Sequence, residues 1–197
     1  LLILVLLGVF CSPAAAKTVK IKMATLAPKG SMFYRTLKNM GETWKYLSQG
    51  KVKLKIYPGG IAGGDKDVVR KIKLGTINAG MVTSAGLATL HRAVNVFQLP
   101  AGFHSADELD YLVKEMAPKL NKIYADHGLV VLTWGEAGWV RFLSKTPMMN
   151  LEERGQQKVF IYAGNPEQVD VWKSAGFNVV PLPPAEISTA LQTGLIT

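Results

Sequence analysis

The sequence contains very little cysteine and histidine. Cys11 is the single cysteine among 197 residues, so no disulfide can form within the chain and no site of several cysteines can bind a metal. The three histidines, His91, His104 and His127, lie far apart without cysteine or glutamate at ligand spacing. We therefore expect surface histidines, no metal site and no cofactor.

The sequence also lacks the short motifs of common enzymes. It has no Gly-x-Ser-x-Gly nucleophile elbow, and the glycine pairs at 59–60 and 63–64 are not followed by the Lys-Ser/Thr of a phosphate loop. An enzyme would need an acid or base, for which Glu136, Glu186 and Asp65 are the candidates. The absence of these motifs favours a binding protein, with an enzyme as the weaker alternative.

The apolar run at 1–10 is too short to span a bilayer. Three alanines at 14–16 follow it, which is typical of a secretory signal cleaved after Ala16 and predicts a periplasmic protein. A buried N-terminal strand is the alternative interpretation. Because Met and a basic segment do not precede the run, we expect the signal peptide 1–16 to be incomplete. Phe10 is too bulky for the position before a lipid-modified Cys11.

Acidic residues are outnumbered, with 14 Asp and Glu against 23 Lys and Arg and a net charge of +9. Such a charge raises nucleic acid as a partner. Export argues against it, and so does the distribution of the lysines. Lys20 and Lys22 alternate with apolar residues, as do Lys53 and Lys55, which indicates the solvated face of half-buried strands. The charge would still attract anionic solutes or an anionic membrane surface at long range.

Strand and helix patterns alternate along the chain, which predicts an α/β fold with parallel sheets. Glycines follow most of the expected helices, and Ser31, Asp65 and Asn165 are their expected N-caps. Ser105 with Glu108 predicts a capping box before the longest helix. The expected strands are 19–25, 52–57, 79–82, 129–134, 158–162 and 179–181, and the last helix is 186–193.

The pattern changes at Gly135, after which residues 135–144 read as an extended segment. We expect the chain to cross between two domains near Gly138. This expectation places residues 17–137 in a first lobe and residues 138–197 in a second lobe.

Six segments resemble one protein family in order and spacing. They are Ala-Pro-Lys-Gly-Ser at 27–31, Tyr-Pro-Gly-Gly at 57–60, Lys-Ile-Lys-Leu-Gly-Thr-Ile at 71–77, Leu-Pro at 99–100, Gly138 to Arg141 with Lys-Thr-Pro at 145–147, and Ala-Leu-Gln-Thr-Gly at 190–194. Together they resemble the DctP-like solute-binding subunits of TRAP (tripartite ATP-independent periplasmic) transporters.

The resemblance implies a two-lobed periplasmic binding protein of type II-like architecture that encloses a small organic acid and delivers it to TRAP membrane subunits. It also implies that a C-terminal portion absent from this sequence would complete both lobes. We therefore expect the second lobe to be truncated here and the 197-residue form not to be stable by itself.

Candidate ligand contacts follow from loop positions and from the resemblance. Ligands of open α/β sheets bind beyond the carboxyl ends of strands, and helix N-termini favour anions. The resemblance makes Arg141 a contact to the acid, whereas pairing with Glu136 or Glu153 is the alternative. The full set of expected contacts is Arg141, Phe160, Tyr162, Trp139, Pro28, Ser31, Phe103 and Asn165.

The second arginine of the family is missing. Relatives carry a Gly-x-Lys-x-Arg-Val strand whose arginine clasps the carboxylate, but if Lys158 aligns with the family lysine, Phe160 occupies the arginine position. Phe160, Tyr162, Trp139, Trp134 and Phe103 would then line a more apolar pocket, unless they fill the cores. We expect a more apolar acid than is usual, with a neutral hydrophobic or lipid-like ligand as the alternative.

Overall fold

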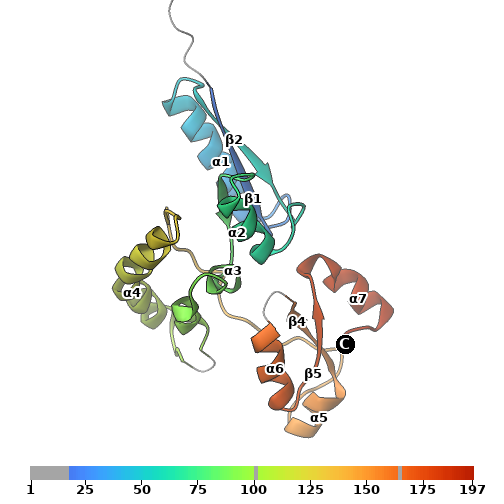
Figure 1. The fold of residues 1–197 in the computed structure, drawn as a ribbon. Helices are drawn as coiled ribbons and strands as arrows, with labels where there is room; N and C mark the ends of the chain where they lie inside the picture. The colour runs from blue at the N-terminus through green and yellow to red at the C-terminus, as the bar shows by residue number, and fades with distance from the viewer. Residues whose placement is uncertain (1–17, 100–101, 164–165) are drawn as a thin grey trace, which may run out of the picture.

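The computed structural model describes residues 18–99, 102–163 and 166–197 (Figure 1). Its strands form two separate parallel sheets, one ordered β2-β1-β3 and the other β4-β5. The expected α/β class is therefore present in both halves of the chain. The expected signal segment 1–16, Cys11 and Asn165 lie outside the described residues.

The first sheet pairs β1 with β2 on one side and with β3 on the other. The register between β1 and β2 places Val19 opposite Val52 and Ala24 opposite Tyr57. The elements of this part are β1 (Val19–Thr25), α1 (Met32–Leu47), β2 (Val52–Tyr57), α2 (Asp65–Lys73) and β3 (Ala79–Met81).

Helix α1 packs on one face of this sheet. Ser31 is its N-cap, as expected, and its hydroxyl accepts a hydrogen bond from the Tyr34 backbone N–H at 3.2 Å. Leu37 and Gly41 are buried, and a Cβ at Gly41 would lie 2.9 Å from the Leu54 Cβ. The close approach requires glycine at position 41. Helix α2 covers the other face near the carboxyl ends of the strands, where Ala24, Ala62, Val68 and Ile77 form a core.

A third group of elements packs around Val94, Leu120 and Tyr124, all fully buried. Trp134 lies against this cluster, with its ring centroid 5.9 Å from that of Phe97. The group consists of α3 (Ser84–Ala88), the 3-10 helix η1 (Arg92–Gln98) and α4 (Ala106–Asp126). Figure 1 shows α4 on the side of the molecule away from the second sheet.

The second sheet consists of β4 (Lys158–Tyr162) and β5 (Asn178–Leu182) and is packed on both faces. Ile161, Val169 and Val179 form the core on one face, and Leu182, Ala190 and Ile196 form the core on the other. The surrounding elements are α5 (Leu151–Gln156), α6 (Pro166–Ser174), η2 (Pro184–Glu186) and α7 (Ile187–Thr193), and α7 ends at Gly194 with a φ of 72°.

Two local predictions are wrong. Residues 129–134 do not form a strand and pair with no sheet in the part of the chain that the structure describes. Gly64, not Asp65, is the N-cap of α2, and Asp65 is its first residue. The 3-10 helix η1 at residues 92–98 was not expected. Helix α5 was not expected.

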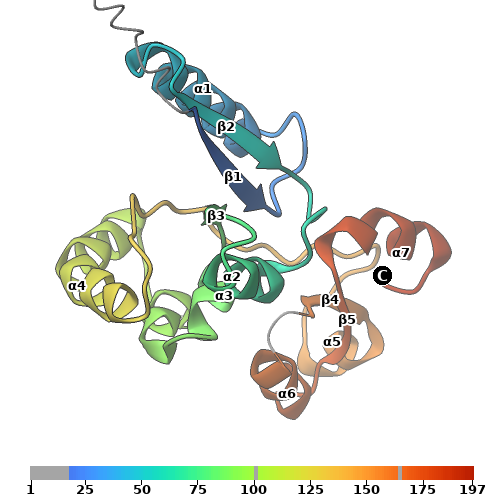
Figure 2. The same ribbon diagram turned by 45° about the horizontal axis from the view of Figure 1, so that its top comes forward.

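The chain runs from α4 to α5 through residues 127–150 without a regular element, and Figure 2 shows this stretch passing behind α2 and β3. Across the described ranges, no helix combines the length and apolar character needed to cross a bilayer.

Candidate functional site

The loops that follow β1 and β2 are tied together at the carboxyl end of the first sheet. The Gly59 N–H donates to the Ala27 carbonyl at 2.9 Å, and the Gly60 N–H donates to the Thr25 carbonyl at 3.1 Å. Gly59 and Gly60 have φ values of 64° and 77°, which favour glycine. The loops therefore lie side by side at the edge where ligands of open α/β sheets bind.

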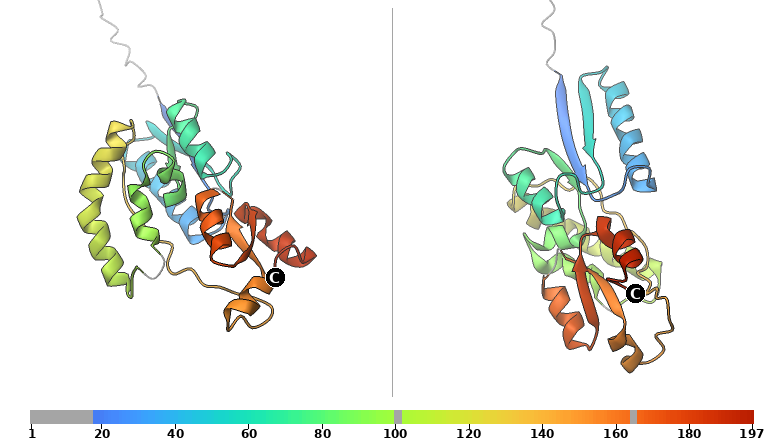
Figure 3. Two further views of the ribbon diagram at one scale, coloured as in Figure 1. Left: turned by 60° about the horizontal axis from the view of Figure 1, so that its bottom comes forward. Right: turned by 90° about the vertical axis from the view of Figure 1, so that its right-hand side faces the viewer.

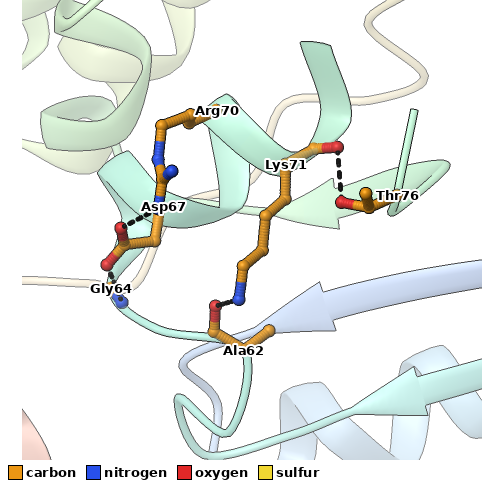
Figure 4. Close-up of polar contacts among 6 residues, drawn as sticks. All are labelled: Ala62, Gly64, Asp67, Arg70, Lys71 and Thr76. Atoms are coloured by element: carbon orange, nitrogen blue, oxygen red, sulfur yellow. Dashed lines mark hydrogen bonds and ion pairs between the residues drawn. The ribbon is translucent and has the colours of Figure 1, made fainter. Parts of the chain in front are cut away.

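Side chains of α2 hold the loop that follows β2 against the helix (Figure 4). The Lys71 ammonium donates to the Ala62 carbonyl at 2.7 Å. The Asp67 carboxylate accepts from the Gly64 backbone N–H at 3.2 Å and from Arg70 at 3.1 Å. These contacts hold the glycine-rich segment 58–64 against the first turn of the helix.

Asp65 is buried at the start of α2, with 1% of its surface exposed. Its Oδ2 accepts hydrogen bonds from the Thr83 backbone N–H and from the Thr83 hydroxyl, whereas its Oδ1 has no partner. Burial raises the pKa of this carboxyl above 3.8, and the Thr83 hydrogen bonds oppose the shift. Gly86 leaves room for the side chain, since a Cβ there would lie 2.7 Å from the Asp65 Cβ.

Tyr162 connects the two sheets at this point. The Asp65 backbone N–H donates to the Tyr162 hydroxyl oxygen at 3.2 Å, joining the N-terminus of α2 to the carboxyl end of β4. A Cβ at Gly64 would lie 3.4 Å from the same oxygen. Burial raises the pKa of the half-buried Tyr162 hydroxyl, and the charges of Asp65 and Asp67 act in the same direction. Tyr162 is thus at the junction where the sequence analysis expects a ligand.

Two of the expected pocket aromatics pack elsewhere. Phe160 is half-buried against the cluster of Leu182, Ala190 and Ile196, beneath α7. The Trp134 ring packs between Phe97 and Tyr124, and its indole N–H donates to Asn121 Oδ1 at 2.9 Å. These contacts match the alternative that the aromatic side chains fill cores.

Arg141 and Trp139 lie in the irregular stretch between α4 and α5. Arg141 is exposed, and within the described residues it makes no ion pair or hydrogen bond, so neither Glu136 nor Glu153 pairs with it. Glu153 instead accepts from the Met149 backbone N–H at 2.7 Å. The Trp139 side chain is 54% exposed.

The remaining expected residues are dispersed. The Pro28 carbonyl accepts from the Ser31 backbone N–H at 3.1 Å, in the loop after β1. Phe103 is half-buried just before α4, and Asn165 lies outside the described residues. The structure thus places Pro28 and Ser31 in the loop next to the glycine-rich segment and Tyr162 at the α2 N-terminus, whereas Phe160 packs beneath α7.

Neither Thr83 nor a binding role for the Asp65 side chain was predicted from the sequence. A signal for Asp65 existed, because an aspartate directly after a glycine-rich loop and before an apolar helical stripe occupies a first turn that favours acidic side chains. Among the described residues, no three His, Cys, Asp or Glu side chains are grouped as a metal site requires.

A family model for the bacterial extracellular solute-binding proteins, family 7 (DctP), matches residues 23–197. The chain belongs to this family. Curated relatives of the family 7 chain include an uncharacterized protein of Haemophilus influenzae, 26% identical over 92% of this chain and 56% of the relative. The 2,3-diketo-L-gulonate-binding periplasmic protein YiaO of Escherichia coli is 27% identical over 81% of this chain and 49% of its own length. The family 7 chain thus spans about half the length of these relatives.

Solved structures of TRAP periplasmic solute-binding proteins share the fold of this family 7 chain. One from Xanthobacter autotrophicus, with bound β-D-galacturonate, superposes with a TM-score of 0.80 at 26% identity, covering 89% of this chain and 59% of that protein. One from Pseudomonas putida, with bound D-glucuronate, gives a TM-score of 0.79 at 28% identity, covering 90% of this chain and 59% of that protein. The family 7 chain therefore has the α/β fold of a two-lobed periplasmic binding protein.

Proposed function

We propose that the protein is an extracytoplasmic receptor that captures a small organic acid and delivers it to the membrane subunits of a TRAP transporter. The observation that carries this proposal is the family match over residues 23–197. Relatives of similar fold that bind galacturonate and glucuronate support an acid as the ligand. A receptor releases its solute unchanged, which separates it from an enzyme on the same scaffold.

The ligand would lie where the two sheets meet. The loops after β1 and β2, the N-terminus of α2 and the Tyr162 hydroxyl converge there. Backbone N–H groups at a helix N-terminus attract anions. The raised pKa of Asp65 keeps part of that carboxyl neutral at low pH and so reduces its repulsion of an acid.

The passage between the lobes would lie near Gly138, dividing residues 17–137 from 138–197. Two contacts support this position. Trp134 packs on the α4 side, against Phe97 and Tyr124. Phe142 packs on the second lobe, with its ring centroid 5.5 Å from that of Trp172 in α6. Gly138 itself has a φ of 89°, which permits the chain to turn between these contacts.

The whole protein can be tested for capture without conversion. Solute that co-purifies is identified by mass spectrometry, and binding of D-galacturonate, D-glucuronate and succinate is measured by calorimetry. We expect saturable binding of at least one acid and full recovery of the unchanged compound. Recovery of a chemically altered solute in proportion to the protein, or no binding of any acid, would overturn the proposal.

Arg141 is the cation that we propose for the ligand carboxylate. A single charge-assisted hydrogen bond contributes about 1.5–3 kcal/mol, so Arg141→Ala should weaken acid binding roughly ten- to a hundredfold. Lys114→Ala removes an exposed cation from α4 and is the matched control, for which affinity should hardly change. If Arg141→Ala also leaves affinity unchanged, the ligand is neutral or another group holds the acid.

The ligand would be more apolar than a sugar acid, because the strand at 158–162 carries no arginine. Substitution of Phe160 tests whether this position faces a core or the ligand. Its ring packs against Leu182 and Ala190, so Phe160→Arg should bury an unpaired guanidinium and lower the stability of the second lobe. The measurement is thermal unfolding together with succinate affinity. A gain in succinate affinity without loss of stability would show that position 160 faces the ligand.

A further inference from the structure

One face of the first sheet changes character along its length. At the carboxyl end, Ala24 and Tyr57 are paired and pack against Val68 of α2. Toward the amino end, the same face carries Lys20 and Lys22 on β1, since successive side chains of a strand alternate between faces. The face is therefore buried and apolar at one end and exposed and basic at the other.

The length of α2 explains where the change occurs. Nine helical residues span about 14 Å, whereas the seven residues of β1 span about 23 Å. Helix α2 lies near the carboxyl ends of β1 and β2, and α1 runs along the strands on the other side (Figure 3, right). No described element covers the amino-terminal part of the face opposite α1.

Four lysines occupy this uncovered part, and we call them the lysine face: Lys20, Lys22, Lys53 and Lys55. Lys20 is directly opposite Lys53, and Lys22 is directly opposite Lys55, in the parallel register of β1 and β2. All four are exposed, and within the described part of the chain none makes an ion pair or donates a side-chain hydrogen bond. The Lys55 ammonium lies 5.1 Å from the centroid of the Tyr57 ring.

The register of these lysines is electrostatically unfavourable for the sheet. Like charges directly opposite each other on neighbouring strands destabilise a sheet, and here two such pairs are adjacent. Alternating the sign of the charges between the strands would have given favourable pairs on the same solvated face. Four ammonium groups that pair with no carboxylate of the described residues favour an anionic partner beyond those residues.

We propose that the lysine face binds the anionic headgroups of a phospholipid membrane. Lysine ammonium groups are mobile point charges that need no fixed partner geometry, which suits a fluid anionic surface. The apolar side chains Ile21 and Leu54 point to the α1 side, and Tyr57, the aromatic residue beside Lys55, packs against the α2 core. The lysine face therefore lacks the large exposed apolar or aromatic anchor that dominates protein interfaces. Each lysine near an anionic leaflet adds to the attraction, and the excess charge of +9 acts in the same direction.

Membrane contact through this face goes beyond solute capture. The lysine face lies toward the amino ends of β1 and β2, whereas the proposed ligand site lies beyond their carboxyl ends. The two surfaces can therefore be occupied at once. A receptor held loosely at the membrane surface searches for its transporter in two dimensions.

The test measures co-sedimentation of the whole protein with vesicles of phosphatidylcholine alone or with about one third phosphatidylglycerol. The variant K20Q/K22Q/K53Q/K55Q is compared with K114Q/K119Q/K122Q/K173Q, which removes the same charge from exposed lysines of α4 and α6. We expect binding only to the anionic vesicles, a loss of roughly a hundredfold or more in the first variant, and a much smaller loss in the second. Equal losses, or equal binding to neutral vesicles, would overturn the proposal.

Two further measurements keep the outcome clear. The two-site variant K20Q/K53Q removes one cross-strand pair, should fold at least as stably as the parent protein, and should show an intermediate loss of binding. Acetylation of lysines, mapped by mass spectrometry, should modify the lysine face in free protein and less so with anionic vesicles. Lysines that resist acetylation without vesicles are covered by the rest of the protein, which refutes the proposal. Capture of an acidic protein through this face without vesicle binding would also refute it.

Discussion

At the scale of single residues, Asp65 lies in an environment that is unfavourable for a charged carboxylate. It is buried, one of its oxygens is unpaired, and its backbone N–H is bound by a tyrosine from the other sheet. A raised pKa means that the folded state holds a proton more tightly than the unfolded state. The contribution of Asp65 to the free energy of unfolding is therefore largest at low pH and falls as the pH rises through the raised pKa.

Substitution of Asp65 by asparagine tests the direction of this pH dependence. In the parent protein, the free energy of unfolding should fall as the pH rises above the ordinary pKa of 3.8. The side chain of Asp65→Asn cannot ionise, so this fall should become smaller in the variant. Urea unfolding of the whole protein at several pH values between about 4 and 7 measures the slope. The control Asp126→Asn, an exposed carboxylate at the end of α4, should retain the parent slope. An unchanged slope in Asp65→Asn would show that folding does not raise the pKa of Asp65.

At the scale of elements, the helices with clear caps were the most predictable from sequence. Ser31 and Ser105 cap α1 and α4 as the pattern indicates, and each accepts a hydrogen bond from the backbone N–H three residues later. These contacts are local, so a short sequence window contains everything that determines them.

Ser31 also lies in the candidate site, which makes its cap worth testing. Loss of the hydroxyl in Ser31→Ala should lower stability by about 1 kcal/mol, because the Tyr34 N–H loses its acceptor. Ser31→Asp retains an acceptor and adds a favourable charge at the helix N-terminus, so it should keep most of the stability. Chemical unfolding of both variants distinguishes the cap from a general sensitivity of this loop. Equal destabilisation by both substitutions would contradict the role of the cap.

The sequence was less informative where structure depends on distant partners. The apolar residues at 129–134 match a central strand, but a strand forms only where another strand pairs with it, and Val130 and Leu132 are instead 84% and 69% exposed. The contact between Asp65 and Tyr162 joins positions 97 residues apart, which no local pattern reveals. Helix α5 had a readable signal that was missed, since Asn150 accepts from the Glu153 N–H at its start.

At the scale of the whole molecule, the two sheets are small, with three strands in one and two in the other among the described residues. Their connection at 127–150 exposes several large apolar side chains, among them Val140, Leu143 and Met149. Sheets of this size with open edges are marginally stable. The solved relatives with the same fold are longer, since this chain covers about 59% of their length.

We expect residues 1–197 produced by themselves to unfold without a sharp transition. The apolar side chains between α4 and α5 are exposed in this form, so they do not stabilise the folded state by burial. Their exposure favours association between molecules. Calorimetry and binding of a hydrophobic dye provide the measurement, with a solute-binding protein of the length of the relatives as the comparison. A cooperative transition similar to that of the longer protein would contradict this expectation.

The exposed position of Trp139 has an optical consequence. Indole emission shifts to shorter wavelength when water leaves its surroundings, and Trp139 is 54% exposed two residues from Arg141. Trp134 and Trp172 already pack against other aromatic rings, and Trp44 is half-buried on α1, so their surroundings should change less. Closure of the two lobes over a solute would therefore be visible as a blue shift that originates mainly from a single tryptophan, without any attached label.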